Sequence, residues 1–346
     1  MELKIEYEFG KYLEFESHDI NYFIGSNYQL KWKLYRSFQR FSTGKILSDL
    51  EENVYGDDGI NFFYDQKVLN AKKMLIHFLD SRESILSACQ FSKGSLIYNQ
   101  LEDYENNFEI MKLLDLINDD ILKLEISFQQ SFEKNGFHAI KPTFSPLTYS
   151  GFLKNSLELQ YLEKDEPYPL SMMDVGYLLD EYCNLLFSEI QRTQKECWIV
   201  INKPEYFLHD QLLQKLLQKF KDIGKETNLL KVFWISDYYL DEDFSVDDIE
   251  KVIFLGERAE QFPPYETLKQ SIRLRYPDEF KLTDNELLNS LHRIIPRISE
   301  NQDLLHLPLK DMVLLKVINQ LMGYLDTQYS INYDNLSELE YKFLAD

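Results

Sequence analysis

The chain has 346 residues, with 37 basic and 58 acidic side chains and a formal net charge of −21. This charge excludes a protein that coats nucleic acid or an anionic membrane with its whole surface, so any basic binding site must be local. Hydrophobic residues make up 44% of the chain and aromatic residues 14%, which excludes a disordered acidic chain and predicts a globular protein. Its length allows two domains, or one large domain with an appendage.

The cysteines and the apolar runs indicate the compartment. Cys89, Cys183 and Cys197 are odd in number and lack the spacing of a metal site, which favours reduced thiols in a core. The N-terminus lacks the basic start and apolar core of a signal peptide, and no apolar run reaches membrane-spanning length. We therefore expect a cytoplasmic protein without a membrane partner.

The first part of the chain predicts strands followed by a helix. Residues 3–9 and 11–16 alternate apolar and charged around Gly10, which predicts a hairpin with one solvated face. Residues 21–24 predict a short strand that ends at Gly25. An apolar stripe at helical spacing follows, formed by Leu30, Leu34, Phe38 and Phe41.

The rest of the chain divides into a helical middle, an α/β segment and a helical end. Residues 66–135 and 147–194 carry apolar patterns of helical period. Three fully apolar runs of strand length follow, at 197–201, 232–235 and 252–255, with an amphipathic helix at about 209–221. Such strands suit a parallel sheet covered on both faces. We predict an α/β fold with a head of residues 1–60 and 195–256, an inserted helical arm of residues 61–194, and a helical C-terminal extension of residues 257–346.

The turn at Gly25 lies where a phosphate-binding P-loop would lie. A working P-loop has a second glycine that cradles the phosphates and a hydroxyl that binds Mg²⁺. Leu30 and Trp32 occupy these two positions, and only the lysine, Lys31, remains. The strand expected to supply a metal-binding aspartate ends in Asn202. We therefore expect a degenerate, P-loop ATPase-like head that is not an enzyme.

Other catalytic and metal-binding motifs are missing from the sequence. It has no G-x-S-x-G, G-x-G-x-x-G, H-E-x-x-H or C-x-x-C, and its six histidines are dispersed. One acidic run lacks the glycine and the last glutamate of an EF-hand loop, so a solvated loop is favoured over a calcium site. Its members are Asp237, Asp241, Glu242, Asp243, Asp247, Asp248 and Glu250.

Positive charge is concentrated between Gly25 and Lys45, a stretch without a carboxylate. Lys33, Arg36 and Arg40 have the spacing of one helical face, which can follow a phosphate backbone, and a solvated helix face explains the pattern equally well. A second cluster lies on the helix after residue 209, where a solvated face is slightly favoured. The candidate DNA-binding residues are Lys31, Lys33, Arg36, Arg40, Lys45, Lys215, Lys219, Lys221 and Lys225.

Part of the α/β segment resembles a known family. The strand that ends in Asn202, the turn 203–208, the leucine-rich helix and the strand 230–236 are similar to the C-terminal half of the CRISPR-associated Csn-two proteins of type II-A systems. The degenerate P-loop ahead of a helical insertion agrees with this family. The resemblance covers about residues 1–256, and the additional residues 257–346 make the chain similar to the large form of the family.

The resemblance implies a non-catalytic, ring-shaped homotetramer that binds the ends of double-stranded DNA in a basic central hole. Such rings assist the acquisition of new spacers, alongside the integrase pair and the effector nuclease. A basic hole is compatible with a net charge of −21 because the outer surface can stay acidic. Family members also bind Ca²⁺ through carboxylates in the arm, but the corresponding residues 143–147 contain none, so we assign no metal ligand.

Two other functions remain open on the sequence. The first is a nucleotide-dependent enzyme with a divergent P-loop, in which Lys31 would contact phosphate. The second is an acidic scaffold that recruits basic partner proteins. ATP turnover would favour the enzyme, and a protein that binds neither DNA nor turns over ATP would favour the scaffold.

Overall fold

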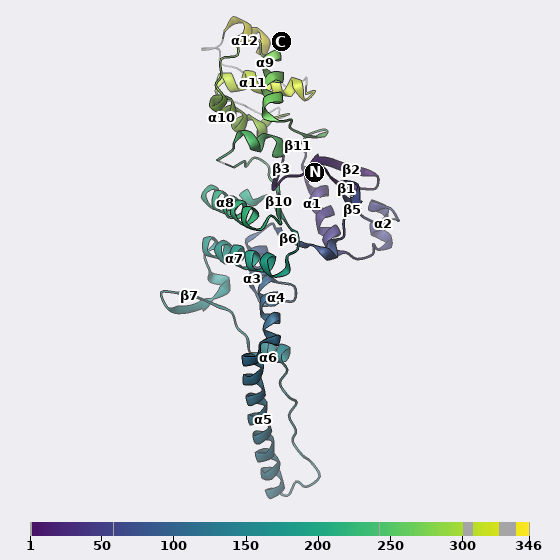
Figure 1. Cartoon of the computed structure of the whole chain (residues 1–346), viewed down its shortest axis with the longest axis vertical. Helices are drawn as coiled ribbons and strands as arrows, with labels where there is room; N and C mark the ends of the chain where they lie inside the picture. Colours follow the sequence, from purple (N-terminus) through teal and green to yellow (C-terminus); the bar gives the residue numbers. More distant parts are fainter. Residues whose placement is uncertain (1, 58, 242, 300–306, 325–336, 346) are drawn as a thin grey trace. The chain divides into compact units, whose positions relative to one another are not determined.

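The computed structural model describes residues 2–57, 59–241, 243–299, 307–324 and 337–345. Its internal contacts divide the chain into two compact units, Met1–Arg82 with Thr193–Asp346, and Glu83–Arg192. We call the first unit the head and the second the arm (Figure 1). None of the helices in the described ranges is long and apolar enough to cross a membrane.

A six-stranded sheet forms the centre of the head, in the order β12-β11-β3-β10-β9-β6. Five strands run parallel, and β12 is antiparallel to its neighbour β11. The strands are β3 (Ile20–Ile24), β6 (Leu75–Leu79), β9 (Cys197–Asn202), β10 (Leu230–Ile235), β11 (Val252–Leu255) and β12 (Ala259–Gln261). The four apolar runs predicted as strands are confirmed as β3, β9, β10 and β11, and nearly all their residues are buried.

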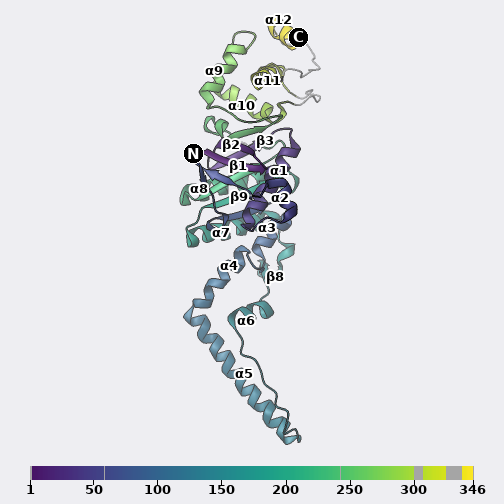
Figure 2. The same cartoon turned by 90° about the vertical axis from the view of Figure 1, so that its right-hand side faces the viewer.

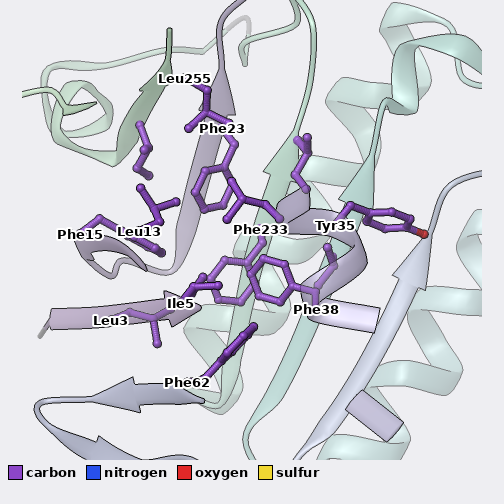
Figure 3. Packing of buried hydrophobic residues seen from close by; sticks show 14 of the residues in the cluster. Leu3, Ile5, Leu13, Phe15, Phe23, Tyr35, Phe38, Phe62, Phe233 and Leu255 are labelled. Carbon is purple, nitrogen blue, oxygen red and sulfur yellow. The ribbon is translucent and has the colours of Figure 1, made fainter. Parts of the chain in front are cut away.

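A second, antiparallel sheet packs against the same face of the central sheet as helix α1 (Tyr28–Thr43). It contains β1 (Glu2–Glu8), β2 (Lys11–Glu16), β4 (Phe62–Tyr64) and β5 (Lys67–Val68), in the order β2-β1-β4-β5. Figure 3 shows Phe38 of α1 among the aromatic rings of this core; its ring centre lies 4.8 Å from that of Phe233. Phe41 of α1 stacks on Phe62 at 4.3 Å. These contacts fix α1, and with it the loop between β3 and α1.

Helix α8 (Asp210–Thr227) contacts β10 of the central sheet. Its buried stripe is Leu213, Leu216, Leu217, Phe220 and Ile223, which confirms the predicted amphipathic helix. The short helical elements of this part of the head include α2 (Asp49–Tyr55) and the 3-10 turns η1 (Ala71–Lys73), η4 (Pro204–Tyr206) and η5 (Val246–Lys251).

The head reaches residue 82, not residue 60 as the sequence predicts. Strand β4 pairs with β1, and β6 pairs in parallel with β9, so residues 61–82 belong to the head's sheets. Short apolar runs such as Leu75–Leu79 are compatible with a helix or a strand, and pairing with a distant strand decides between them.

The C-terminal extension belongs to the same unit as the head. Its first residues form β12 rather than a helix, and four α-helices follow among its described residues. These are α9 (Tyr265–Arg275), α10 (Asp284–Ile294), α11 (Leu309–Leu321) and α12 (Glu338–Ala345). Helix α11 contacts the other three helices and buries every residue from 311 to 319. The strongly apolar pattern predicted after residue 309 therefore forms the core of this bundle.

The arm is mainly helical, as predicted. Its elements are α3 (Arg82–Cys89), α4 (Leu96–Glu102), α5 (Phe108–Lys134), α6 (Tyr149–Ser156), the hairpin β7 (Gln160–Glu163) and β8 (Glu166–Pro169), and α7 (Val175–Thr193). The segment after α5 runs back along that helix (Figure 2), where Gln129 Nε2 donates to Pro142 O at 2.9 Å and Phe144 N donates to Glu125 Oε2 at 2.7 Å. Only Leu114 of the 27 residues of α5 is buried.

Candidate functional site

The loop between β3 and α1 lies at the edge of the sheet where the parallel strands end. Ligands of open α/β sheets bind at this edge. Gly25 has φ 140°, and a Cβ there would lie 2.4 Å from Leu255 O. Asn27 caps α1 by accepting a hydrogen bond from Leu30 N at 2.9 Å, and its own N–H donates to Leu255 O at 3.0 Å. Two backbone N–H groups that a phosphate would need are therefore already paired with the chain.

Lys31 points into the head and pairs with a carboxylate. Its Nζ lies 2.8 Å from Oδ1 of Asp237, which follows β10, and its side chain is only 1% exposed. Oδ2 of Asp237 accepts hydrogen bonds from Lys203 Nζ at 2.9 Å and from the Tyr206 hydroxyl at 3.0 Å. Glu205 completes the cluster by accepting from the backbone N–H of Asp237 at 2.6 Å.

The charges of this cluster compensate one another. Burial opposes ionisation of Asp237, but hydrogen bonds from Lys31 and Lys203 outweigh it and hold the pKa of this carboxyl below its ordinary value. Burial lowers the pKa of Lys31, although Asp237 favours its charged form. Burial also raises the pKa of Glu205. The anion that a P-loop lysine would normally contact is supplied here by the chain itself.

Exposed aromatic rings surround the cluster. The Nζ of Lys203 lies 4.8 Å from the ring centre of Tyr28 and 5.4 Å from that of Tyr206. These two tyrosines are 58% and 71% exposed. Rings placed this way hold an ammonium group by a cation–π contact, which keeps Lys203 over Asp237.

The C-terminal extension covers the same edge of the sheet. The hydroxyls of Ser26 and Ser299 are hydrogen-bonded at 2.7 Å. Asn27 Nδ2 donates to Gly256 O at 2.8 Å, and the space beside Gly256 is taken by Tyr324, whose hydroxyl would lie 1.8 Å from a Cβ at that position. The loop between β3 and α1, which lies where a P-loop would lie, is thus capped by Asn27 and contacted by the extension.

The sequence predicted a solvated loop for the acidic run that begins at Asp237, and the structure contradicts this prediction. Asp237 pairs with two lysines, Asp241 pairs with Lys221, and Asp248 lies 3.2 Å from Lys251. Only Asp243 and Asp247 are exposed, Glu250 is half-buried, and Glu242 lies outside the described residues. The lysine partners of Asp237 and Asp241 lie 20 or more residues away in the sequence, so these pairs could not be predicted from local patterns.

The basic residues predicted on α1 face acidic and carbonyl groups of the head. Lys33 Nζ lies 2.7 Å from Glu8 Oε1. Arg36 donates from Nε to the Tyr55 hydroxyl at 3.1 Å. Arg40 Nε lies 2.7 Å from Glu51 Oε1, and its guanidinium also donates to Ile46 O at 2.9 Å. Strand β1 and helix α2 supply these partners. The three cations therefore stabilise the head, in addition to any contact that they make with DNA.

Lys45 is exposed and has basic neighbours that the sequence prediction missed. A Cβ on Gly44 would lie 3.4 Å from the Lys72 side chain, so Lys72 lies beside the loop that carries Lys45. We call Lys45, Lys72 and Lys73 the η1 patch. No ion pair is found for these three lysines within the part of the chain that the structure describes. The sequence signal was the stretch 66–79, which has no carboxylate but was assigned to the arm.

The four lysines predicted on α8 have different surroundings. Lys221 pairs with Asp241. Lys215 and Lys225 are exposed and Lys219 is half-buried. Lys225 lies in the last turn of α8, where a positive charge favours the helix dipole. Among the described residues, no group of three or more His, Cys, Asp or Glu side chains could hold a metal ion.

Solved structures show a fold similar to that of this chain. No family model matches the chain, and no curated protein matches it. Stu0660 of Streptococcus thermophilus matches at 17% identity and a TM-score of 0.81, covering 99% of this chain and 100% of that one. Two ATP-binding cassette structures, cbiO1 from Clostridium perfringens and MJ0796, have TM-scores of 0.34 and 0.30 at 14% and 10% identity, which is too low to support an argument. The first covers 80% of this chain and 95% of its own, and the second 75% and 99%. The chain therefore has the fold of Stu0660 along its whole length, which fits the Csn-two family indicated by its sequence motifs.

Proposed function

We propose that the chain is a CRISPR-associated protein of the Csn-two type that binds ends of double-stranded DNA and assists spacer acquisition in the cytoplasm. This proposal rests on two independent similarities that agree, one in sequence motifs and one in fold. The motifs around Asn202 resemble this family, and the fold matches Stu0660 from the first strand through the extension. The integrase pair and the effector nuclease are the proposed partners in this process.

The proposed role is non-catalytic, with a P-loop ATPase-like head that has lost its chemistry. Lys31 is engaged by Asp237, the N–H groups of the β3–α1 loop are capped, and the extension contacts the same loop. A nucleotide would have to displace all three. We expect no ATP or GTP hydrolysis above that of a Lys31→Ala variant, and turnover above that control would favour the nucleotide-dependent enzyme instead.

The η1 patch is the proposed contact for the DNA backbone in the head. Its lysines are exposed, and none of them has a carboxylate partner in the described ranges. Unpaired lysines bind phosphates without sequence preference and release counterions as they do so. Affinity for duplex DNA should therefore fall steeply with salt and depend little on sequence.

The test compares linear and covalently closed circular duplexes of the same sequence in gel shifts at several salt concentrations. A ring that threads a duplex needs a free end, so linear DNA should bind and closed circles should not. Equal binding to both would contradict a closed ring. Binding of neither form, without ATP turnover, would favour the acidic scaffold.

Two triple variants with the same change of charge locate the contact. Lys45→Glu, Lys72→Glu and Lys73→Glu alter the η1 patch, whereas Lys215→Glu, Lys219→Glu and Lys225→Glu alter α8. We expect the first triple to weaken binding to linear DNA and to flatten the salt slope by about one unit per lost phosphate contact. Loss of binding only in the α8 triple would move the contact to that helix. The α1 cations suit this test less well because Lys33 and Arg40 hold the head together through Glu8 and Glu51.

The homotetrameric ring is proposed because the arm leaves a long apolar face without a partner. Leu113, Leu116, Ile117 and Leu124 of α5 are 61%, 53%, 39% and 50% exposed. Separations of three, four and seven residues place them on one side of the helix. An apolar stripe of this length is typical of an interface between helices, and closed symmetry can cover it with a second copy.

A further inference from the structure

The arm contains a hollow of about 870 Å³ that the proposed DNA contact does not use. One wall is the hairpin strand β7 with its turn, and the other is a face of α7 that carries Tyr177, Glu181 and Leu185. A second hollow of about 450 Å³ also borders the hairpin and shares Leu159, Gln160 and Leu170 with the first hollow, which we call the groove. All of these residues belong to the arm.

Large apolar side chains line the groove and are open to solvent. Leu162, Met172 and Tyr177 are 71%, 67% and 66% exposed, while Met173 and Cys89 are buried at its base. Single exposed apolar residues are common on protein surfaces, but three around one hollow mark a site for another apolar surface. The two methionines suit such a site because their flexible side chains adapt to different shapes.

The rim of the groove is negatively charged. Four carboxylates line it, against one lysine, Lys164. The carboxylates are Glu163, Asp174, Asp180 and Glu181. Desolvation and the charges of Glu163 and Asp174 raise the pKa of the Tyr161 hydroxyl. The groove therefore offers an apolar floor with a local charge of about −3 at neutral pH.

The hairpin that forms one wall of the groove can change its conformation at low cost. Lys164 and Asp165 form its two-residue turn, with φ of 52° and 67°. Strands β7 and β8 pair only with each other, and Tyr161 packs against Tyr168 at 5.6 Å between ring centres. A two-stranded sheet of four residues a side has little stability of its own, so contacts with a bound segment can shift it at low cost.

We propose that this groove binds an amphipathic helix of a different protein, with apolar anchors flanked by lysine or arginine side chains. The carboxylate rim disfavours nucleic acid and favours a segment that carries basic side chains. A helix laid along α7 can place apolar residues at intervals of three and four into such a groove.

The probe for this proposal is a fluorescein-labelled 14-residue peptide of leucine and lysine in a helical pattern, with a matched peptide in which glutamate replaces lysine. Fluorescence anisotropy with the full-length protein should show saturable binding of the lysine peptide and none of the glutamate peptide. Hydrogen exchange should show added protection in β7 and α7. Protection elsewhere, or none, would overturn the proposal.

Groove variants separate specific docking from general attraction to an acidic protein. The double variant Leu162→Ser and Tyr177→Ser should weaken binding at least tenfold, and Asp174→Asn with Glu181→Gln should weaken it severalfold and reduce its dependence on salt. Leu162 and Tyr177 are mostly exposed, so their replacement should leave thermal unfolding unchanged. Asp115→Asn with Asp119→Asn removes the same charge from exposed positions on α5 and should not affect binding. An equal loss in the α5 control, or no loss in the groove variants, would contradict the proposed site.

Discussion

The ammonium group of Lys31 and the carboxylate of Asp237 form an ion pair that is almost closed to solvent, with 1% and 9% of their side chains exposed. The pair joins the first turn of α1 to the end of β10, two elements separated by 206 residues. A buried charge that loses its partner is strongly unfavourable, whereas apolar replacement of a whole pair is often tolerated. This asymmetry leads to the first prediction.

Asp237→Asn should destabilise the head by about 3 kcal/mol because it leaves Lys31 buried without a counter-charge. Lys31→Met should cost less, and the double variant should be more stable than Asp237→Asn alone. Urea unfolding followed by tryptophan fluorescence measures this in the head, where all three tryptophans lie. Strictly additive effects of the two changes would show that the pair does not couple α1 to β10.

The pH dependence of the same variant follows from the lowered pKa of Asp237. A carboxyl whose folded pKa lies below its unfolded value adds stability that is complete above the unfolded value, about 3.9, and is lost as pH falls through the folded value. The difference in stability between wild type and Asp237→Asn should therefore be constant from about pH 5 to 8 and shrink only below about pH 4. A difference that disappears near neutral pH would assign the effect to another group.

Gly25→Ala should unfold the head or cost more than about 3 kcal/mol, because φ is 140° and the added Cβ would meet Leu255 O at 2.4 Å. Gly224→Ala is the matched control. Gly224 lies inside α8 with nothing within 4 Å of its Cβ position, so this change should stabilise the head by about 0.5–1 kcal/mol. Thermal unfolding of both variants measures these changes in stability. A Gly25→Ala variant that is only slightly destabilised would show that β11 can move away from the loop.

Much of the secondary structure of the head can be predicted from local sequence patterns, whereas the contacts of the candidate site cannot. Residues 252–255 are apolar throughout, and residues 20–24 are apolar except for Asn21, because both faces of the sheet are covered, and this was readable in the sequence. The residues of β6 looked helical because the pairing with β9 that makes them a strand is non-local. Lys31 was predicted to be available to phosphate, since nothing near it in sequence announces Asp237. Sequence patterns report periodicity and local charge, whereas the partner of a buried charge is set by the topology.

Leu113→Glu with Leu124→Glu should reduce the oligomer, because both positions lie on the exposed apolar side of α5. The wild-type protein should have about four times the monomer mass in light scattering, and this variant a smaller mass. Leu122→Glu with Ile126→Glu is the control, since these exposed residues lie on the other side of the same helix. A monomeric wild type at micromolar concentration, or loss of the oligomer in both variants alike, would count against an interface on the Leu113 face.

Glu340→Gln should release helix α12 from the extension. The Glu340 carboxylate accepts from Lys310 Nζ at 2.6 and 2.7 Å and from the Tyr276 hydroxyl at 2.8 Å, and its side chain is 1% exposed. Limited proteolysis should cut after residue 337 faster in this variant than in wild type. Glu338→Gln removes a neighbouring carboxylate whose partner, Lys342, is exposed, and it should leave the rate unchanged. Equal rates for both variants would mean that the Glu340 contacts do not hold α12.

The carboxylate of Asp237 also bears on how such a protein could move. Nucleotide-driven motors alternate between loaded and empty states because an outside anion arrives at the loop and leaves it. In this head the carboxylate that pairs with Lys31 is a permanent part of the polypeptide. With the non-catalytic role proposed above, a ring of these heads around a duplex would travel by thermal diffusion alone. Its direction would be set by the free end through which it entered and by whatever protein blocks the way back.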